Sequence, residues 1–203
     1  LSLMARKARP EDVIVFFFSG HGTPEPVDEA TDHGEIDGTD ESIVLADGRM
    51  SDNELASLAD AIAADTLLFV IDACHAGGFA RDLIDRPGRV GFFSSDEDVL
   101  SSTAEPIDAG GYLSAAFIEG ARGAADARPR DTAVTIGELA DFMTAFGVEH
   151  HGAMNPAASN APMQRFVLER GAHTWDTLLW ALPCDESDPG CAASACATDS
   201  VVA

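Results

Sequence analysis

The sequence predicts an α/β fold built on a mostly parallel central sheet. Three apolar runs, at 13–18, 67–71 and 90–94, have the near-continuous hydrophobicity of strands that are covered on both faces. Helical patterns alternate with the strands along the chain, which favours parallel pairing through crossover helices. The 203 residues, 46% of them hydrophobic, suffice for one domain with a full core.

The elements of the first half follow in order. Residues 1–9 are short, basic and helix-like, and the run 13–18 is the first strand. The acidic, Gly- and Pro-rich stretch 23–49 is typical of a long loop, with a short hairpin around 42–48. A capping box at Ser51 and Glu54 then begins a helix whose apolar stripe packs on the sheet and returns the chain to the strand at 67–71.

The second half continues the alternation of strands and helices. The predicted elements are a strand at 90–94, helices at 112–121 and 135–146, a strand at 163–168 and an amphipathic turn at 175–182. The segment 152–162, rich in Ala, Asn and Pro, is typical of a loose loop. We therefore predict a catalytic domain over 1–170, followed by an amphipathic segment and a disordered tail over 171–203.

Two motifs stand at the ends of predicted strands. Ser-Gly-His-Gly at 19–22 follows the first strand, and Asp-Ala-Cys-His-Ala-Gly-Gly at 72–78 follows the strand at 67–71. In open α/β sheets the chemistry gathers at the carboxyl ends of the strands, so we expect His21 and Cys74 to meet there. A thiolate attacks a carbonyl, and a nearby imidazole accepts the thiol proton and returns it to the leaving amine. The predicted nucleophile is Cys74 and the predicted base is His21.

Neighbouring residues suggest how a substrate is held. Side chains alternate along a strand, so Asp72 points with Cys74 and Ser19 points with His21. A carboxylate at the floor of a pocket selects a cationic side chain, and we predict that Asp72 and Ser19 bind Arg or Lys before the cleaved bond. The backbone N–H groups of Gly22 and Cys74 are candidates for the oxyanion site.

Two alternatives at these positions stay open. His75 adjoins the nucleophile, but strand-end neighbours point apart, so it is the weaker candidate for the base. Asp72 could instead accept hydrogen bonds from loop N–H groups in a purely structural role.

The two motifs together resemble those of the caspase-like cysteine peptidases. An Asp two residues before the Cys, here Asp72, resembles the metacaspase and orthocaspase branch, whereas true caspases cut after Asp and carry a different run around the nucleophile. The resemblance covers roughly residues 11 to 170. It implies a caspase-hemoglobinase fold with a three-layer sandwich, a Cys–His dyad, and endopeptidase cleavage after Arg or Lys. Calcium activation and self-cleavage often accompany this activity in the family.

The resemblance also bears on the start of the chain. In the family, two strands and their helices precede the His-bearing strand, which is central in the sheet. We therefore expect an amino-terminally incomplete domain, in which a missing segment or another chain pairs with the run 13–18. Without such a partner, an apolar, aggregation-prone edge would be exposed.

Calcium is the one ion that the resemblance suggests, although the chemistry itself requires no cofactor. Calcium-binding metacaspases use acidic residues after the His, at the next helix start and after the Cys. The matching positions here are Asp40, Asp52 and Asp82, with Asp85 as a rival for the last. Three carboxylates with carbonyls and waters would fill a calcium shell. The pair Asp52-Asn53 departs from the paired Asp common in the family, and acids are favoured in a first helical turn anyway.

Self-processing is predicted from a basic segment soon after the nucleophile. Caspase relatives are often cut in the corresponding linker, where this chain carries Arg81, Arg86 and Arg89. Arg86 precedes Pro87, a poor bond to cleave, so Arg89 and Arg81 are the candidates. The segment 122–130 is a second candidate.

Composition limits the partners. Acidic residues number 35 against 12 basic ones, giving a net charge of −23, which argues against nucleic acid and anionic membranes. The acid surplus has three candidate causes: attraction of basic substrates, calcium sites, and solubility in a saline habitat. No apolar run approaches the roughly 20 residues of a membrane span and the start lacks a signal-peptide core, so a cytoplasmic location is expected.

Other classes of function are less favoured. A catalytically silent caspase-like binding module would keep the fold, and the presence of both dyad residues argues against it. A serine α/β-hydrolase would need a Gly-x-Ser-x-Gly elbow, which does not occur. Cys184, Cys191 and Cys196 could hold one disulfide or a metal, but their spacing matches no zinc pattern, and we expect them to lie in a disordered tail.

Overall fold

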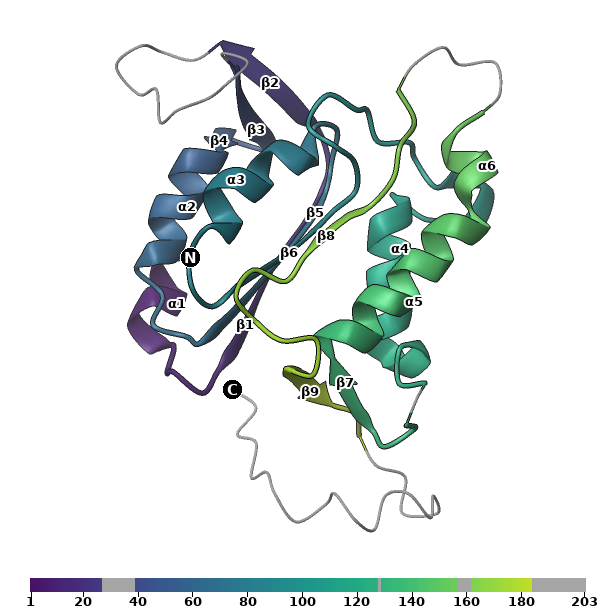
Figure 1. Ribbon diagram of the computed structural model, residues 1–203. Helices are drawn as coiled ribbons and strands as arrows, with labels where there is room; N and C mark the ends of the chain where they lie inside the picture. Colours follow the sequence, from purple (N-terminus) through teal and green to yellow (C-terminus); the bar gives the residue numbers. More distant parts are fainter. Residues whose placement is uncertain (27–38, 128, 157–161, 184–203) are drawn as a thin grey trace.

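The computed structural model describes residues 1–26, 39–127, 129–156 and 162–183. Its centre is a four-stranded sheet in the order β1-β5-β6-β8, drawn in Figure 1. The four strands are β1 (Val13–Ser19), β5 (Thr66–Asp72), β6 (Arg89–Phe93) and β8 (Val167–Glu169). The first three strands are parallel and β8 is antiparallel to β6, which confirms the predicted α/β class with a mostly parallel sheet.

Helices cover both faces of this sheet, giving three layers (Figure 1). One face carries α1 (Ser2–Lys7), α2 (Asp52–Asp60) and α3 (Phe79–Ile84). The other carries α4 (Tyr112–Glu119), α5 (Ile136–Glu149) and the short α6 (His151–Met154). The three-layer sandwich is as predicted.

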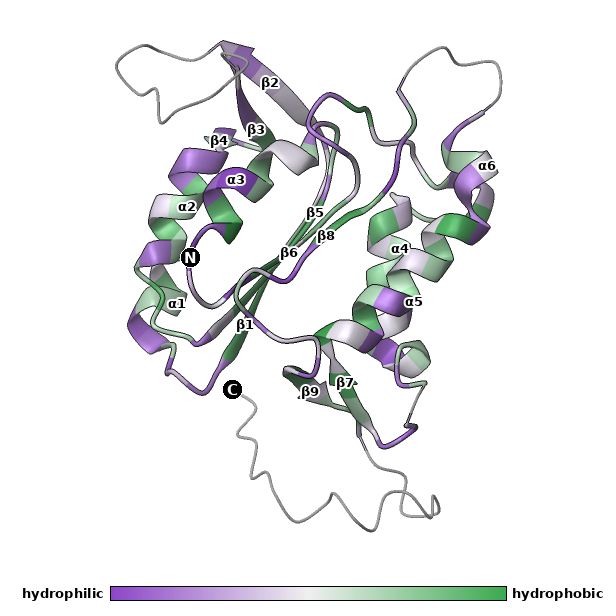
Figure 2. Ribbon diagram, in the orientation of Figure 1, coloured by the Kyte–Doolittle hydropathy of each residue, from purple (hydrophilic) through white to green (hydrophobic). Residues whose placement is uncertain are grey.

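The central strand β5 is buried along its whole length because its side chains pack into two separate hydrophobic cores, one on each face of the sheet. Leu67, Phe69 and Ile71 pack toward α2 and α3, whereas Leu68 and Val70 pack toward α4 and α5. This alternation is the period of two expected of a strand between helical layers. Figure 2 shows the hydrophobic colouring concentrated along β1, β5 and β6. Within the described parts of the chain, no helix is long and apolar enough to cross a membrane.

Two small sheets flank the main one. The first joins β2 (Gly22–Pro26), β3 (Thr39–Leu45) and β4 (Gly48–Ser51), and the second pairs β7 (Ala133–Thr135) with β9 (Leu178–Ala181). The hairpin expected around 42–48 is confirmed as β3 and β4. The expected loop from 23 is wrong at its start, because residues 22–26 form β2 against β3. Residues 27–38 of that loop lie outside the described residues.

Local signals placed most helix starts correctly. The Ser51 hydroxyl accepts a hydrogen bond from Glu54 N–H at the start of α2, and Thr135 with Glu138 forms a full capping box at α5. The expected amphipathic turn at 175–182 is wrong in part, because its last residues form β9. Three short pieces complete the chain: η1 (Ala76–Gly78), η2 (Glu105–Ile107) and the π-helical η3 (Gly120–Ala124).

Candidate active site

Parallel pairing of β1 with β5 brings the two motifs to one edge. The register runs from Val13 opposite Thr66 to Ser19 opposite Asp72, where both strands end. Gly20 N–H donates to the Asp72 carbonyl at 3.0 Å and so continues the pairing past the strand ends. His21 and Cys74 each lie two residues beyond the last pair. The structure therefore places them at neighbouring positions on the carboxyl edge of the sheet.

The two motifs also approach each other closely at Gly22. A methyl group on Gly22 would lie 2.0 Å from the Cys74 carbonyl oxygen and 3.1 Å from Ala73 Cβ, so only glycine fits here. The His21 carbonyl accepts a hydrogen bond from Val44 N–H at 2.9 Å, which fixes this corner to β3. His21 is exposed and Cys74 is half-buried, so neither residue is enclosed in the core.

The sulfur of Cys74 contacts the backbone of a distant loop. Ser101 N–H donates to Sγ at 3.4 Å, and the thiol donates to the Ser101 carbonyl at 3.8 Å. These contacts give the sulfur a defined position, with a backbone donor directed at the atom that carries charge in a thiolate.

His75 is engaged elsewhere. It adopts φ 61°, in the left-handed region, and its Nδ1 lies 2.7 Å from the Glu97 carbonyl oxygen. Its backbone N–H donates to the Val99 carbonyl at 3.0 Å. His75 therefore shapes the loop that follows the nucleophile, as its position beside Cys74 suggested.

Asp72 is buried under the start of α4. Only 4% of it is exposed, and it accepts a hydrogen bond from Ser114 N–H at 2.7 Å. Gly111, the N-cap residue of α4, has no side chain to cap the helix, and a methyl there would lie 2.1 Å from the Asp72 carboxylate. Asp72 thus supplies the cap from β5. Burial raises the pKa of Asp72, and the hydrogen bonds from Ser114 oppose that rise.

Ser19 borders the same corner. It is exposed at the end of β1, and a methyl group on Gly110 would lie 3.8 Å from its hydroxyl oxygen. A cavity of about 510 Å³ lies nearby, with Gly110 and Ser114 in its lining. Asp108, Glu119 and Arg122 also line this cavity, so its wall carries two acidic groups and one basic group.

The candidate calcium residues are neighbours without forming a metal centre. Asp52 is fully buried, and its burial, helped by the charges of Asp82 and Asp40, raises its pKa to about 7. Asn53 donates a hydrogen bond to Asp40 at 3.1 Å. Across the described residues, however, no three His, Cys, Asp or Glu side chains are arranged to hold a metal ion. The rival Asp85 is exposed just after α3.

The candidate cleavage sites are held in regular structure. Arg89 lies in β6 with 4% exposed, pairs with Asp60 at 2.7 Å and places its guanidinium 5.5 Å from the centre of the Phe69 ring. Arg81 lies in α3 and donates to Glu97 at 3.0 Å. Arg122 and Arg130, in the second candidate segment, are exposed.

Three polar residues near the nucleophile were missed. Ser94, Ser101 and Gln164 form hydrogen bonds around the peptide that precedes Cys74. Ser94 directly follows β6, so the strand-end argument that identified His21 and Cys74 would have found it. Ser101 and Gln164 carry no comparable local signal.

Together, the layers and the strand-end residues define an α/β protein that presents a cysteine and a histidine at one sheet edge. The family model for the caspase domain, a family of cysteine peptidases, matches residues 1–162, and the chain belongs to this family. A search of curated proteins found no match. Among solved structures, the chain is similar to protein GSU0716 from Geobacter sulfurreducens, with a TM-score of 0.55 and 17% identity over 88% of this chain and 75% of that one, which is a likeness of fold.

The close approach at Gly22 predicts a specific steric sensitivity. Gly22→Ala should destabilise the protein by about 1–3 kcal/mol, because its methyl group must push the Cys74 backbone away. Gly48→Ala is the matched control, since nothing lies within 4 Å of the added methyl group. Thermal unfolding of both variants checks this. Equal midpoints for the two variants would contradict the packing described.

Asp52 predicts a pH dependence of stability. Its pKa is raised from 3.8 to about 7 in the folded protein, so the fold favours its protonated form. Its contribution to stability is therefore full below about pH 4 and is lost as the pH rises to about 7, a change of up to about 4 kcal/mol. Asp52→Asn should flatten this dependence in urea unfolding with a chelator present, whereas exposed Asp47→Asn should not. A slope unchanged by Asp52→Asn would contradict the assignment.

Proposed function

We propose that this protein is a cysteine endopeptidase in which Cys74 attacks the peptide carbonyl and His21 is the base. The observation that carries the proposal is the parallel register ending at Ser19 and Asp72, which puts both residues two positions beyond one edge. In this scheme His21 accepts the thiol proton, Sγ bonds to the carbonyl carbon, and the proton then goes to the departing amine. Water hydrolyses the thioester and restores the thiol. The N–H groups of Gly22 and Cys74 are the proposed oxyanion donors.

The proposed specificity is for Arg or Lys before the cleaved bond, as in metacaspases and orthocaspases. Asp72 and Ser19 are the last residues of the two strands that lead to the dyad, and the nearby cavity is lined by two carboxylates, Asp108 and Glu119, together with Arg122. The net charge of −23 also favours a basic substrate. Asp72 already accepts from α4, so a substrate guanidinium would be an additional partner of a carboxylate that is held in place.

Turnover of fluorogenic peptides tests the nucleophile and the base. Cys74→Ala and His21→Ala should each lower kcat/KM for an Arg-terminated peptide by at least about 10³-fold, because one loses the nucleophile and the other its base. The unchanged thermal midpoint of each variant is the control. Activity retained in Cys74→Ala would refute the proposed function. A wild-type protein that is folded but turns over no peptide would favour the silent binding module.

Specificity is tested separately. Asp72→Asn keeps an acceptor for Ser114 N–H but removes the charge, so we expect KM for the Arg peptide to rise by about tenfold or more. The thermal midpoint of Asp72→Asn, compared with that of the wild type, is the control for altered packing. Preferred cleavage of an Asp-terminated peptide by the wild type would contradict basic specificity.

Self-processing and calcium activation are further proposals. Exposure favours cuts at Arg122 or Arg130 over Arg89, which is buried in β6, because a bound peptide must be accessible; Arg130 lies outside the regular elements, whereas Arg122 lies in η3. Intact-mass measurements over time should show fragments ending at 122–130 in the wild type and none in Cys74→Ala. Fragmentation that is equal in both proteins would exclude self-cleavage.

For calcium, Asp40, Asp52 and Asp82 are near one another but do not form a ready-made site, so calcium activation stays a prediction.

A further inference from the structure

Within the segment 99–103, the backbone of Ser101 contacts the sulfur of the proposed nucleophile. Ser101 N–H is directed at Cys74 Sγ at 3.4 Å, and the Ser101 carbonyl faces the thiol at 3.8 Å. Both contacts come from one backbone residue. The position of the sulfur therefore depends on whatever fixes the segment 99–103.

A pair of serines joins this segment to the peptide before the nucleophile. The Ser94 hydroxyl accepts from Ala73 N–H at 2.9 Å and donates to the Ala73 carbonyl at 2.8 Å. The Ser101 hydroxyl lies 2.6 Å from that of Ser94 and 2.8 Å from the Ala73 carbonyl oxygen. The two hydroxyls carry one proton each for these three oxygen–oxygen contacts, so two of the three are hydrogen bonds at any one time.

The side chain of Gln164 adds two hydrogen bonds to this group. Its side-chain Oε1 accepts from Ser102 N–H at 2.8 Å, and its Nε2 donates to the Ser94 carbonyl at 3.0 Å. The residue is 2% exposed. A single side-chain amide therefore joins the end of β6 to the segment that carries Ser101.

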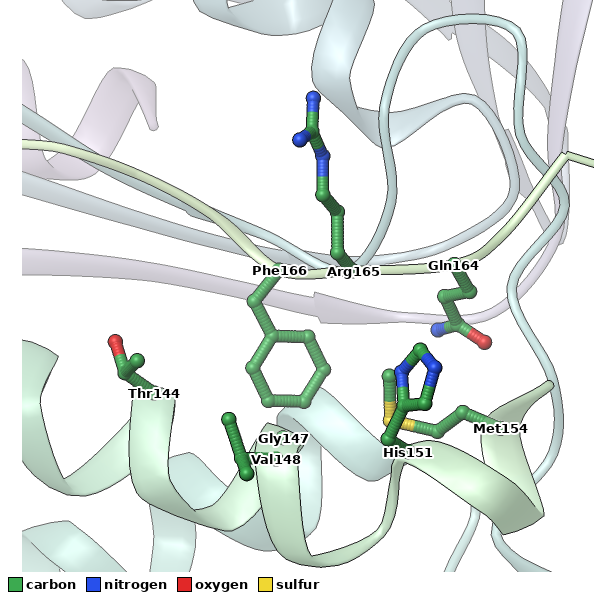
Figure 3. Close-up of a pocket in the computed structure, with 8 residues that line it drawn as sticks. All are labelled: Thr144, Gly147, Val148, His151, Met154, Gln164, Arg165 and Phe166. Atoms are coloured by element: carbon green, nitrogen blue, oxygen red, sulfur yellow. The ribbon is translucent and has the colours of Figure 1, made fainter.

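Gln164 is itself firmly held. Its backbone N–H donates to Asn155 Oδ1 at 2.6 Å, and Asn155 Nδ2 donates back to its carbonyl at 2.9 Å. Figure 3 shows Gln164 and Phe166 directed toward α5 and α6, whereas Arg165 points away from them. The amide thus lies between the helical layer and the loop that contacts the nucleophile.

From these contacts we infer that Gln164 is a positioning residue for Cys74. The inference rests on the proposed function, in which Cys74 is the nucleophile. Gln164 holds Ser102 and, through it, Ser101. The N–H of Ser101 stabilises the reactive thiolate. Only a group with one donor and one acceptor satisfies both Ser102 N–H and the Ser94 carbonyl, and an apolar replacement leaves both buried and unpaired.

The test measures the reactivity of the sulfur independently of peptidase activity. Native wild-type, Gln164→Met and Gln164→Glu proteins are treated with iodoacetamide at pH 7, and peptide mass spectrometry follows Cys74 alone. Gln164→Met should slow alkylation of Cys74 by about fivefold or more, because the N–H donor leaves the sulfur. A buried Glu favours its neutral form, which has one donor and one acceptor, so Gln164→Glu should retain at least half of the wild-type rate.

The control variant removes a comparable pair of side-chain hydrogen bonds, made by a buried residue away from the nucleophile. Asp126 is 5% exposed and accepts from the N–H groups of Asp131 and Thr132 at 3.1 and 3.0 Å. Asp126→Ala should lower the thermal midpoint and leave Cys74 alkylation within about twofold of wild type. If Gln164→Met does not fold, Asn155→Ala should show the same slowing to a smaller degree.

Turnover provides the second readout. With an Arg-terminated peptide, Gln164→Met should lower kcat by about tenfold with KM within twofold of wild type, as expected for a residue that does not touch substrate. A folded Gln164→Met with alkylation unchanged would overturn the inference, as would equal slowing in Asp126→Ala. Failure of the proposed function is distinguishable, because it would appear as turnover retained in Cys74→Ala whatever the alkylation rates.

Discussion

The register between β1 and β5 is the constraint on which the rest of the site depends. Side chains alternate along a strand, so a one-residue slip of β1 would turn Ile14, Phe16 and Phe18 out of the core that α2 and α3 cover. The same slip would carry His21 about 3.3 Å along the edge relative to Cys74. The slip would put Val15 and Phe17 toward that core instead, so its cost is the lost packing of Ile14, Phe16 and Phe18, and this packing protects the spacing of the two reactive groups. Core packing and site geometry are here the same structural requirement.

Asp72 has two roles in this account: it caps α4, and it is the proposed contact for a basic substrate. Its carboxylate completes α4, whose N-cap residue Gly111 offers no side chain, and this ties the helix to the strand that ends at the nucleophile. Burial raises its pKa, so the ordered N–H at Ser114 is needed to keep the charged form accessible. A basic substrate would stabilise the same charge. The structural and substrate-binding interpretations of Asp72 are thus compatible, and they differ in what each predicts for KM and for stability.

The sequence could predict the layers and the two motifs because each depends on local patterns: apolar strands, capping boxes and glycines at strand ends. It could not predict Gln164, which meets Ser94 and Ser102 across 70 and 62 positions of chain. The burial of Arg89 could not be predicted from the sequence for the same reason. This residue follows a Pro-Gly turn that suggests exposure, yet Asp60 and Phe69, distant in sequence, bury it. Likewise, β9 is a strand because β7 offers it a partner, which no periodicity in 175–182 reveals.

The position of β1 at the sheet edge adds a last consequence. Among the described residues β1 pairs with β5 alone, and Val15 and Phe17, on the face that carries α4, are 41% and 43% exposed. On this face Phe17 stacks on Phe117 of α4, at 5.8 Å between ring centres. His21 therefore has a less constrained support than Cys74, whose strand is buried on both faces and paired on both edges. Any strand that paired with the outer edge of β1 would stabilise the base far more than the nucleophile, and this asymmetry makes the histidine side of the site the part most sensitive to a partner.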